Sequence, residues 1–364
     1  MALVWVENWE RISNSTSSSS ESLLNDYISK NLNRNDWATN GEPQLHVGRL
    51  SSKSISIGAG STGDSNFIEV PAGGTSEVIL GFSYKPPIYR NANQNDWIKF
   101  YEYDPANSTP EEQVQLELAD CGFIVRRGTS GRIAELMGAF YQERWNQIEI
   151  RIVFDNSAGV LQIRINGDLL IDKSGINTNE GNNTCNVIRI HGTESPTTTD
   201  EKFLGLIDDI YVLDETGSIA NSSIAPNVFI ESLGPTADGD STDFTPSSGA
   251  NYTNVDESQP SGTDYNSSGT SGDLDLFEMA DLGIVGGAVY GVQVRNVVIN
   301  DAPGYNPVIP KIKENGQEGS GDTWYVLDSD DYSDIRHIFT SNPDTATAWT
   351  VSTVNSMQCG YEIG

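Results

Sequence analysis

Aspartates gathered in one loop are the first residues here that could do chemistry. Asp238, Asp240 and Asp243 lie in one glycine-containing loop. Hard cations such as Ca²⁺ prefer oxygen ligands, which makes this loop a candidate calcium site. The pattern lacks the closing glutamate of an EF-hand, and a solvated acidic turn is the competing interpretation. We therefore expect no cofactor, with calcium as the alternative.

Two further acidic groups have similar chemistry. One comprises Asp328, Asp330, Asp331 and Asp334, and the other is the adjacent pair Asp208 and Asp209. Neither has the spacing of a known cation loop, and ordinary acidic turns explain both groups as well.

The sequence contains only an incomplete version of the carboxylate motif that glycoside hydrolysis requires. A retaining glycosidase needs two carboxylates about 5 Å apart. A strand motif Glu-x-Asp-x-x-Glu places alternate side chains in one cleft. Glu102 and Asp104 fit its start, but Asn107 occupies the third position. The sequence predicts a strand end here and no glycosidase.

The sequence also shows no arrangement of residues typical of nucleophilic catalysis. The three histidines, His46, His191 and His337, lie in strand-like stretches, and no Gly-x-Ser-x-Gly elbow is present. We therefore expect that the chain is not an enzyme. Trp97, Tyr101 and Tyr103 could form a sugar-stacking platform, although such spacing is also typical of core packing.

The charge limits the partners. The chain has 51 acidic and 21 basic residues, for a net charge of −30. Such a surface repels nucleic acid and anionic membranes at long range. We expect neither as a partner, and no stretch is apolar enough to span a bilayer.

The cysteines indicate a reducing compartment. Cys121, Cys185 and Cys359 are an odd, sparse set that makes no disulfide framework and has no metal-ligand spacing. The N-terminal residues lack the positive region of a secretory signal. We expect folding in a cytosol.

Short strands separated by polar turns dominate the pattern, so we predict an all-β chain. Residues 145–154 and 160–165 alternate clearly, and Asn166-Gly167 predicts a two-residue hairpin. One short helix over residues 21–32 competes with a strand there. The other predicted strands are 3–12, 45–50, 54–57, 66–70, 77–84, 96–103, 114–118, 123–127, 133–136, 169–172, 186–191 and the stretch around 203–217.

A polar stretch ending near Pro226 predicts a domain boundary. We expect a jelly-roll domain over 1–220, a linker over 221–227 and a smaller C-terminal β-sandwich over 228–364. Strands in the second domain are predicted at 228–233, 273–279, 288–299, 306–314, 323–325, 335–340 and 356–363.

Three successive segments carry a family resemblance. They are Trp-Asn-Gln-Ile-Glu-Ile-Arg-Ile-Val-Phe-Asp at 145–155, the hairpin around Asn166-Gly167, and Phe-Leu-Gly-Leu-Ile-Asp-Asp-Ile-Tyr-Val-Leu-Asp at 203–214. Together they resemble the back half of concanavalin A-like, or laminin G-like, jelly rolls, particularly those of tailed-bacteriophage virion proteins. Segments of the second domain, including Gly-Asp-Leu-Asp-Leu-Phe-Glu-Met at 272–279, resemble a module that follows such jelly rolls.

This resemblance implies a virion structural protein that is assembled in the host cytoplasm. A capsid decoration or cement role is the first expectation, with the major capsid protein and further copies of the chain as partners. The alternative is a tail or fibre component that acts as a carbohydrate-binding adhesin on host glycan.

Overall fold

The chain is almost entirely β, as predicted. The computed structural model describes residues 2–7, 44–47, 49, 53–56, 67–86, 95–103, 111–119, 122–128, 131–191, 205–214, 216, 228–257 and 261–364. They form two compact units, Met1–Ile230 and Glu231–Gly364. No helix within these ranges has the length and apolar character needed to cross a membrane.

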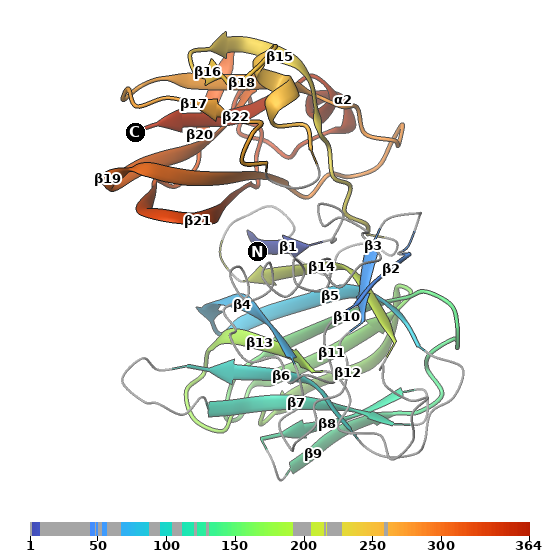
Figure 1. The fold of residues 1–364 in the computed structure, drawn as a ribbon. Helices are drawn as coiled ribbons and strands as arrows, with labels where there is room; N and C mark the ends of the chain where they lie inside the picture. Colours follow the sequence, from blue (N-terminus) through green and yellow to red (C-terminus); the bar gives the residue numbers. More distant parts are fainter. Residues whose placement is uncertain are drawn as a thin grey trace. The chain divides into compact units, whose positions relative to one another are not determined.

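Unit 1, Met1–Ile230, is a sandwich of two antiparallel sheets (Figure 1). The eight-stranded sheet has the order β12-β11-β10-β5-β14-β3-β2, and β1 also pairs with β14. Its strands are β1 (Ala2–Glu7), β2 (Gln44–Val47), β3 (Lys53–Ser56), β5 (Glu77–Lys85), β10 (Asn146–Val153), β11 (Gly159–Ile165), β12 (Asp168–Ile176) and β14 (Leu206–Asp214).

The six-stranded sheet has the order β4-β13-β6-β7-β8-β9. Strand β13 lies between β4 and β6 in this sheet, so it pairs with two strands that are far from it in the sequence. The strands are β4 (Phe67–Thr75), β6 (Asn95–Glu102), β7 (Glu111–Ala119), β8 (Gly122–Arg127), β9 (Gly131–Leu136) and β13 (Cys185–His191).

An aromatic cluster joins the inner faces of the two sheets. Trp97 on β6 is fully buried, and its ring centroid lies 5.5 Å from that of Phe82 and 4.8 Å from that of Tyr84, both on β5. Alternation along each strand sends these side chains inward and the polar ones outward. The core therefore fixes which side chains face away from it.

The predicted hairpin is confirmed at Asn166-Gly167, where β11 turns into β12. Asn166 has φ 53° and Gly167 has φ 91°, as a two-residue turn of this hand requires. The Asn166 side chain accepts a hydrogen bond from the Gln147 backbone N–H at 2.9 Å, which ties the turn to β10.

Unit 2, Glu231–Gly364, is the smaller C-terminal β unit. Its six-stranded sheet has the order β15-β18-β22-β19-β20, and β21 also pairs with β19. A two-stranded sheet of β16 and β17 accompanies it. The elements are β15 (Pro235–Thr242), β16 (Thr245–Pro246), β17 (Asn266–Ser267), β18 (Leu274–Met279), β19 (Val292–Glu314), β20 (Gln317–Ser320), β21 (Trp324–Phe339), β22 (Gln358–Ile363), the 3₁₀ turn η2 (Asn251–Asn254) and the helix α2 (Val351–Asn355).

Some predicted elements of unit 2 differ from the structure. Residues 228–233 are not a strand, and the segments predicted at 288–299 and 306–314 are one continuous strand, β19. Strand β19 continues past Pro303 and Gly304 through irregular pairing between Asn300 and Tyr305. The short helix α2 was not predicted; Thr350 caps it by accepting a hydrogen bond from the Thr353 backbone N–H.

The predicted helix over 21–32 and linker over 221–227 lie outside the described residues. The second unit begins at Glu231, a few residues after the predicted start at Val228. The reason is that Val228 and Ile230 hydrogen-bond to strands of unit 1.

Candidate functional site

A row of polar side chains crosses all six strands on the outer face of the six-stranded sheet. Register pairs Glu69 with Arg189, Arg189 with Lys99, Lys99 with Gln115, Gln115 with Arg126, and Arg126 with Arg132. Cross-strand partners project from the same face of a sheet. We call these six residues the polar row.

Each cation of the polar row has a glutamate beside it. Arg189 Nε lies 2.7 Å from Glu69 Oε1, and Arg126 Nε lies 2.8 Å from Glu117 Oε1. Lys99 Nζ lies 3.2 Å from Glu112 Oε2.

Arg132 pairs with Glu135 in the same way. The polar row, together with Tyr101, Glu112, Glu117 and Glu135, makes up what we call the polar face. Its four cations and four carboxylates balance, in a chain whose net charge is −30.

A bulge in β7 brings Glu112 onto this face. Phe100 pairs with Val114 but Tyr101 pairs with Glu112, so Gln113 is the extra residue. The Gln113 side-chain oxygen accepts a hydrogen bond from the Glu180 backbone N–H at 2.9 Å, which fixes the bulge. Glu112 therefore stands next to Lys99 and Tyr101.

Tyr101 is the aromatic centre of the polar face and is only 7% exposed. Burial raises the pKa of its hydroxyl; nearby Lys99 and Arg189 lower that pKa, and Glu112 raises it further. The Arg189 guanidinium lies 4.8 Å from the centre of the Tyr101 ring and 4.3 Å from that of Phe67. Tyr101 thus remains a neutral hydrogen-bonding phenol at neutral pH.

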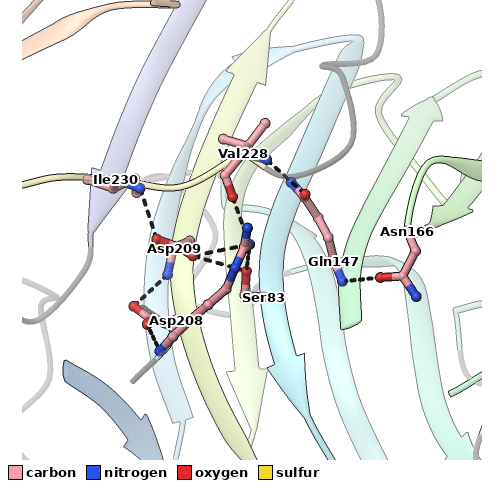
Figure 2. Close-up of polar contacts among 8 residues, drawn as sticks. Ser83, Gln147, Asn166, Asp208, Asp209, Val228 and Ile230 are labelled. Carbon is pink, nitrogen blue, oxygen red and sulfur yellow. Dashed lines mark hydrogen bonds and ion pairs between the residues drawn. The ribbon is translucent and has the colours of Figure 1, made fainter. Parts of the chain in front are cut away.

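A second polar network surrounds Asp208 and Asp209 on β14 (Figure 2). Asp209 has φ 51° beside a bulge, which turns its carboxylate toward Ser83 and the segment 228–230. One oxygen accepts from Ser83 Oγ at 3.1 Å and lies 3.5 Å from Arg49 Nη1, and the other accepts from the Ile230 backbone N–H at 2.9 Å.

Arg49 and Gln147 complete this network. Arg49 donates to the Val228 carbonyl oxygen at 2.9 Å, and Gln147 accepts from the Val228 backbone N–H at 2.9 Å. Asp208 accepts from the backbone N–H groups of Arg49 and Asp209. Both carboxylates thus have protein partners, so this network holds the segment 228–230 on the sheet.

The predicted calcium residues do not converge on one point. Asp240 Oδ2 contacts Lys313 Nζ at 2.8 Å, and the hydrogen bond from Lys313 holds the pKa of Asp240 below its usual value. Asp238 accepts from the Tyr252 backbone N–H, and Asp243 accepts from the Leu274 backbone N–H. No group of three or more metal-ligating side chains occurs in the described part of the chain, and the calcium site stays a prediction.

The other acidic group is only partly described. Asp334 lies between Arg295 and Arg336, with Arg295 Nη2 at 2.6 Å. Asp328, Asp330 and Asp331 lie on β21, but their side chains are outside the described ones. Asp334 therefore forms ion pairs with both arginines.

Of the two interpretations of Trp97, Tyr101 and Tyr103, packing fits the structure better than a sugar-stacking platform. Trp97 is in the core, Tyr101 is buried on the polar face, and only Tyr103 is exposed, at 43%. Of the broken carboxylate motif, Glu102 ends β6, while Asp104 and Asn107 are outside the described residues.

The histidines and cysteines are placed as follows. His191 is buried on β13, and His337 Nδ1 lies 3.2 Å from Asp322 Oδ2. His46 lies on β2. Cys185 and Cys359 are buried free thiols, and Cys121 lies outside the described residues.

Sequence reasoning did not find the polar face. Alternation along single strands was visible, for example Lys99 and Tyr101 around Phe100. Which strands are neighbours depends on long-range pairing, and that pairing assembles the polar row.

No protein-family model matches the chain, and no curated protein sequence does. Solved structures do. An endo-β-1,4-glucuronan lyase from the fungus Trichoderma reesei matches with a TM-score of 0.39 and 13% identity, over 50% of this chain and 92% of that one. Alginate lyase Aly36B matches with a TM-score of 0.39 and 11% identity, over 57% of this chain and 95% of that one.

A Trypanosoma rangeli sialidase matches more weakly, with a TM-score of 0.30 and 9% identity, over 44% of this chain and 27% of that one. These proteins are enzymes that act on carbohydrates. The finding contradicts the expectation that the chain is not an enzyme, and we withdraw that expectation. At these TM-scores no activity or substrate is carried from them to this chain.

Proposed function

We propose that unit 1 binds a carbohydrate chain across the polar face. The observation that carries this proposal is the polar row, which places a hydrogen-bonding side chain on every strand of the six-stranded sheet. Arginine, lysine and glutamine donate and glutamate accepts, which matches the hydroxyl groups of a sugar. The carbohydrate-binding alternative from the sequence thereby becomes the preferred function.

The dimensions favour a polymer over a single small sugar. Neighbouring strands lie about 4.8 Å apart, so six strands span roughly 24 Å. Phe67 adds an aromatic ring beside Arg189 within this span. We therefore expect affinity to rise with the length of the oligosaccharide.

The test is binding to a panel of polysaccharides, with Arg126→Gln as the variant. Arg126 pairs with Glu117 on the polar face, and its loss should weaken binding about tenfold, which is ~1.4 kcal/mol. Affinity electrophoresis or calorimetry measures this. Each incubation is also assayed for new chain ends, which reports cleavage separately from binding.

Arg151→Gln is the matched control. Arg151 lies on β10 of the other sheet and pairs with Glu77 at 2.7 Å in a similarly half-buried setting. This variant should bind as the unchanged protein does. Equal loss in both variants, or no retained polysaccharide at all, would contradict the proposal.

We also propose that the protein is a virion component. The support is the family resemblance, whose segments form the consecutive strands β10, β11 and β12 and the later β14. Mass spectrometry of purified particles tests it. Copies in the hundreds would indicate shell decoration in contact with the major capsid protein, and a small number matching tail symmetry would indicate a tail or fibre component. Absence from purified particles would contradict the proposal.

A further inference from the structure

Two carboxylate oxygens on the polar face are buried without a hydrogen-bond partner among the described residues. They are Glu112 Oε1 and Glu117 Oε2. The second oxygen of Glu117 accepts from Gln115 at 3.0 Å and from Arg126 at 2.8 Å, so half of this carboxylate is satisfied. Glu117 as a whole is only 8% exposed. A buried acceptor without a donor is costly and calls for a partner.

The two acceptors are arranged along one strand. Both belong to β7. Four strand steps separate the two residues when the bulge residue Gln113 is left out, which is roughly 13 Å along the strand at about 3.3 Å per step. A small ion or a single sugar cannot satisfy both. A chain that lies along β7 and presents a donor to each carboxylate can.

Each cation of the polar face already forms an ion pair within the protein. Glu69, Glu112, Glu117 and Glu135 each neutralise one of them. An anionic ligand would have to displace these internal carboxylates, and it would meet a chain with a net charge of −30. Anionic polymers are therefore disfavoured both at long range and at contact.

We propose that the ligand of the polar face is a polysaccharide rich in hydrogen-bond donors and free of anionic groups, such as a neutral or amine-bearing glycan. This inference rests on the proposed carbohydrate function and narrows its ligand class. Hydroxyl or amine groups of the ligand donate to Glu112 Oε1 and Glu117 Oε2. Arg126, about one quarter exposed, stays paired with the other oxygen of Glu117 at 2.8 Å.

The test compares three probes of matched length: laminarin oligosaccharides as the neutral glycan, chitosan oligosaccharides as the amine-bearing one, and alginate oligosaccharides as the anionic one. The full chain is titrated with each probe at low and at moderate salt. We expect laminarin or chitosan to bind at least about tenfold more tightly than alginate. Added salt should weaken chitosan binding more than laminarin binding, because only chitosan is charged.

Glu117→Gln is the variant, since it keeps the shape and removes the carboxylate. It should weaken binding of the preferred glycan about tenfold. Glu77→Gln is the matched control on the other sheet and should leave binding unchanged. If Glu117→Gln does not fold, as judged by circular dichroism, Glu112→Gln serves instead, and the comparison of the three probes needs no variant.

The outcomes separate the two proposals. Tightest binding of alginate would overturn the ligand class while leaving the carbohydrate function intact. Retention of none of the three probes would overturn the inference; the function itself then fails only if the wider polysaccharide panel is also negative. Unchanged binding by Glu117→Gln, or by Glu112→Gln where it replaces Glu117→Gln, would show that the carboxylate does not contact the ligand, which also overturns the inference.

Discussion

Replacing Gly81 with alanine is expected to destabilise unit 1 by about 3 kcal/mol. Gly81 on β5 pairs with Tyr211 on β14, and the Tyr211 ring lies directly over it. A Cβ atom at Gly81 would stand 1.9 Å from Tyr211 Cζ. The ring would have to move and break the 3.0 Å hydrogen bond from its hydroxyl to Glu149.

Urea denaturation of Gly81→Ala measures this loss. Gly131→Ala is the matched control, because its new Cβ would meet nothing closer than 3.6 Å. We expect the control to change stability by less than about 1 kcal/mol. In a Tyr211→Ala background the cost of Gly81→Ala should largely disappear. Full additivity of the two substitutions would contradict the proposed contact.

Replacing Asp209 with alanine is the second large effect, expected to cost about 3–5 kcal/mol. The change removes the acceptor for Ser83, Arg49 and the Ile230 backbone N–H, and Asp209 is 3% exposed. Alanine is also disfavoured at φ 51°, where asparagine and aspartate are tolerated.

Asp209→Asn is the matched control, because it keeps the backbone preference and one acceptor oxygen. Its loss of stability should be clearly smaller than that of Asp209→Ala. Hydrogen exchange should show that residues 228–230 lose protection in the alanine variant while β10 stays protected. If the segment remains protected in Asp209→Ala, the network does not hold it.

Much of unit 1 was predictable because its strands follow simple rules. Strand β11 alternates inward and outward side chains, and Asn166-Gly167 fixes the turn that follows. These signals are local. They depend on the two-residue period of a strand and on the positive φ values that this turn requires.

Unit 2 was less predictable, because its strands break the usual preferences. Strand β15 reads Pro-Thr-Ala-Asp-Gly-Asp-Ser-Thr, a composition typical of turns, yet it pairs with β18 at the edge of the sheet. Strand β19 passes through Pro303-Gly304, which the sequence predicts as a break. Tertiary pairing overrides local propensity at both places.

The polar face could not be predicted because its neighbours are distant in sequence. Arg189 stands beside Lys99 and Glu69, which precede it by many strands. The extra residue Gln113 then shifts Glu112 onto the same face. Neither the strand order nor this bulge has a clear local signal.

The most direct test of the central claim is a hydrogen-exchange footprint of the full chain with and without the best-bound oligosaccharide. We expect slower exchange in β6, β7 and β13, the central strands of the polar face. Exchange in β10, β11 and β12 should be unchanged, because these strands belong to the other sheet. Protection that is confined to β10, β11 and β12, or to unit 2, would contradict the placement of the binding site on the polar face.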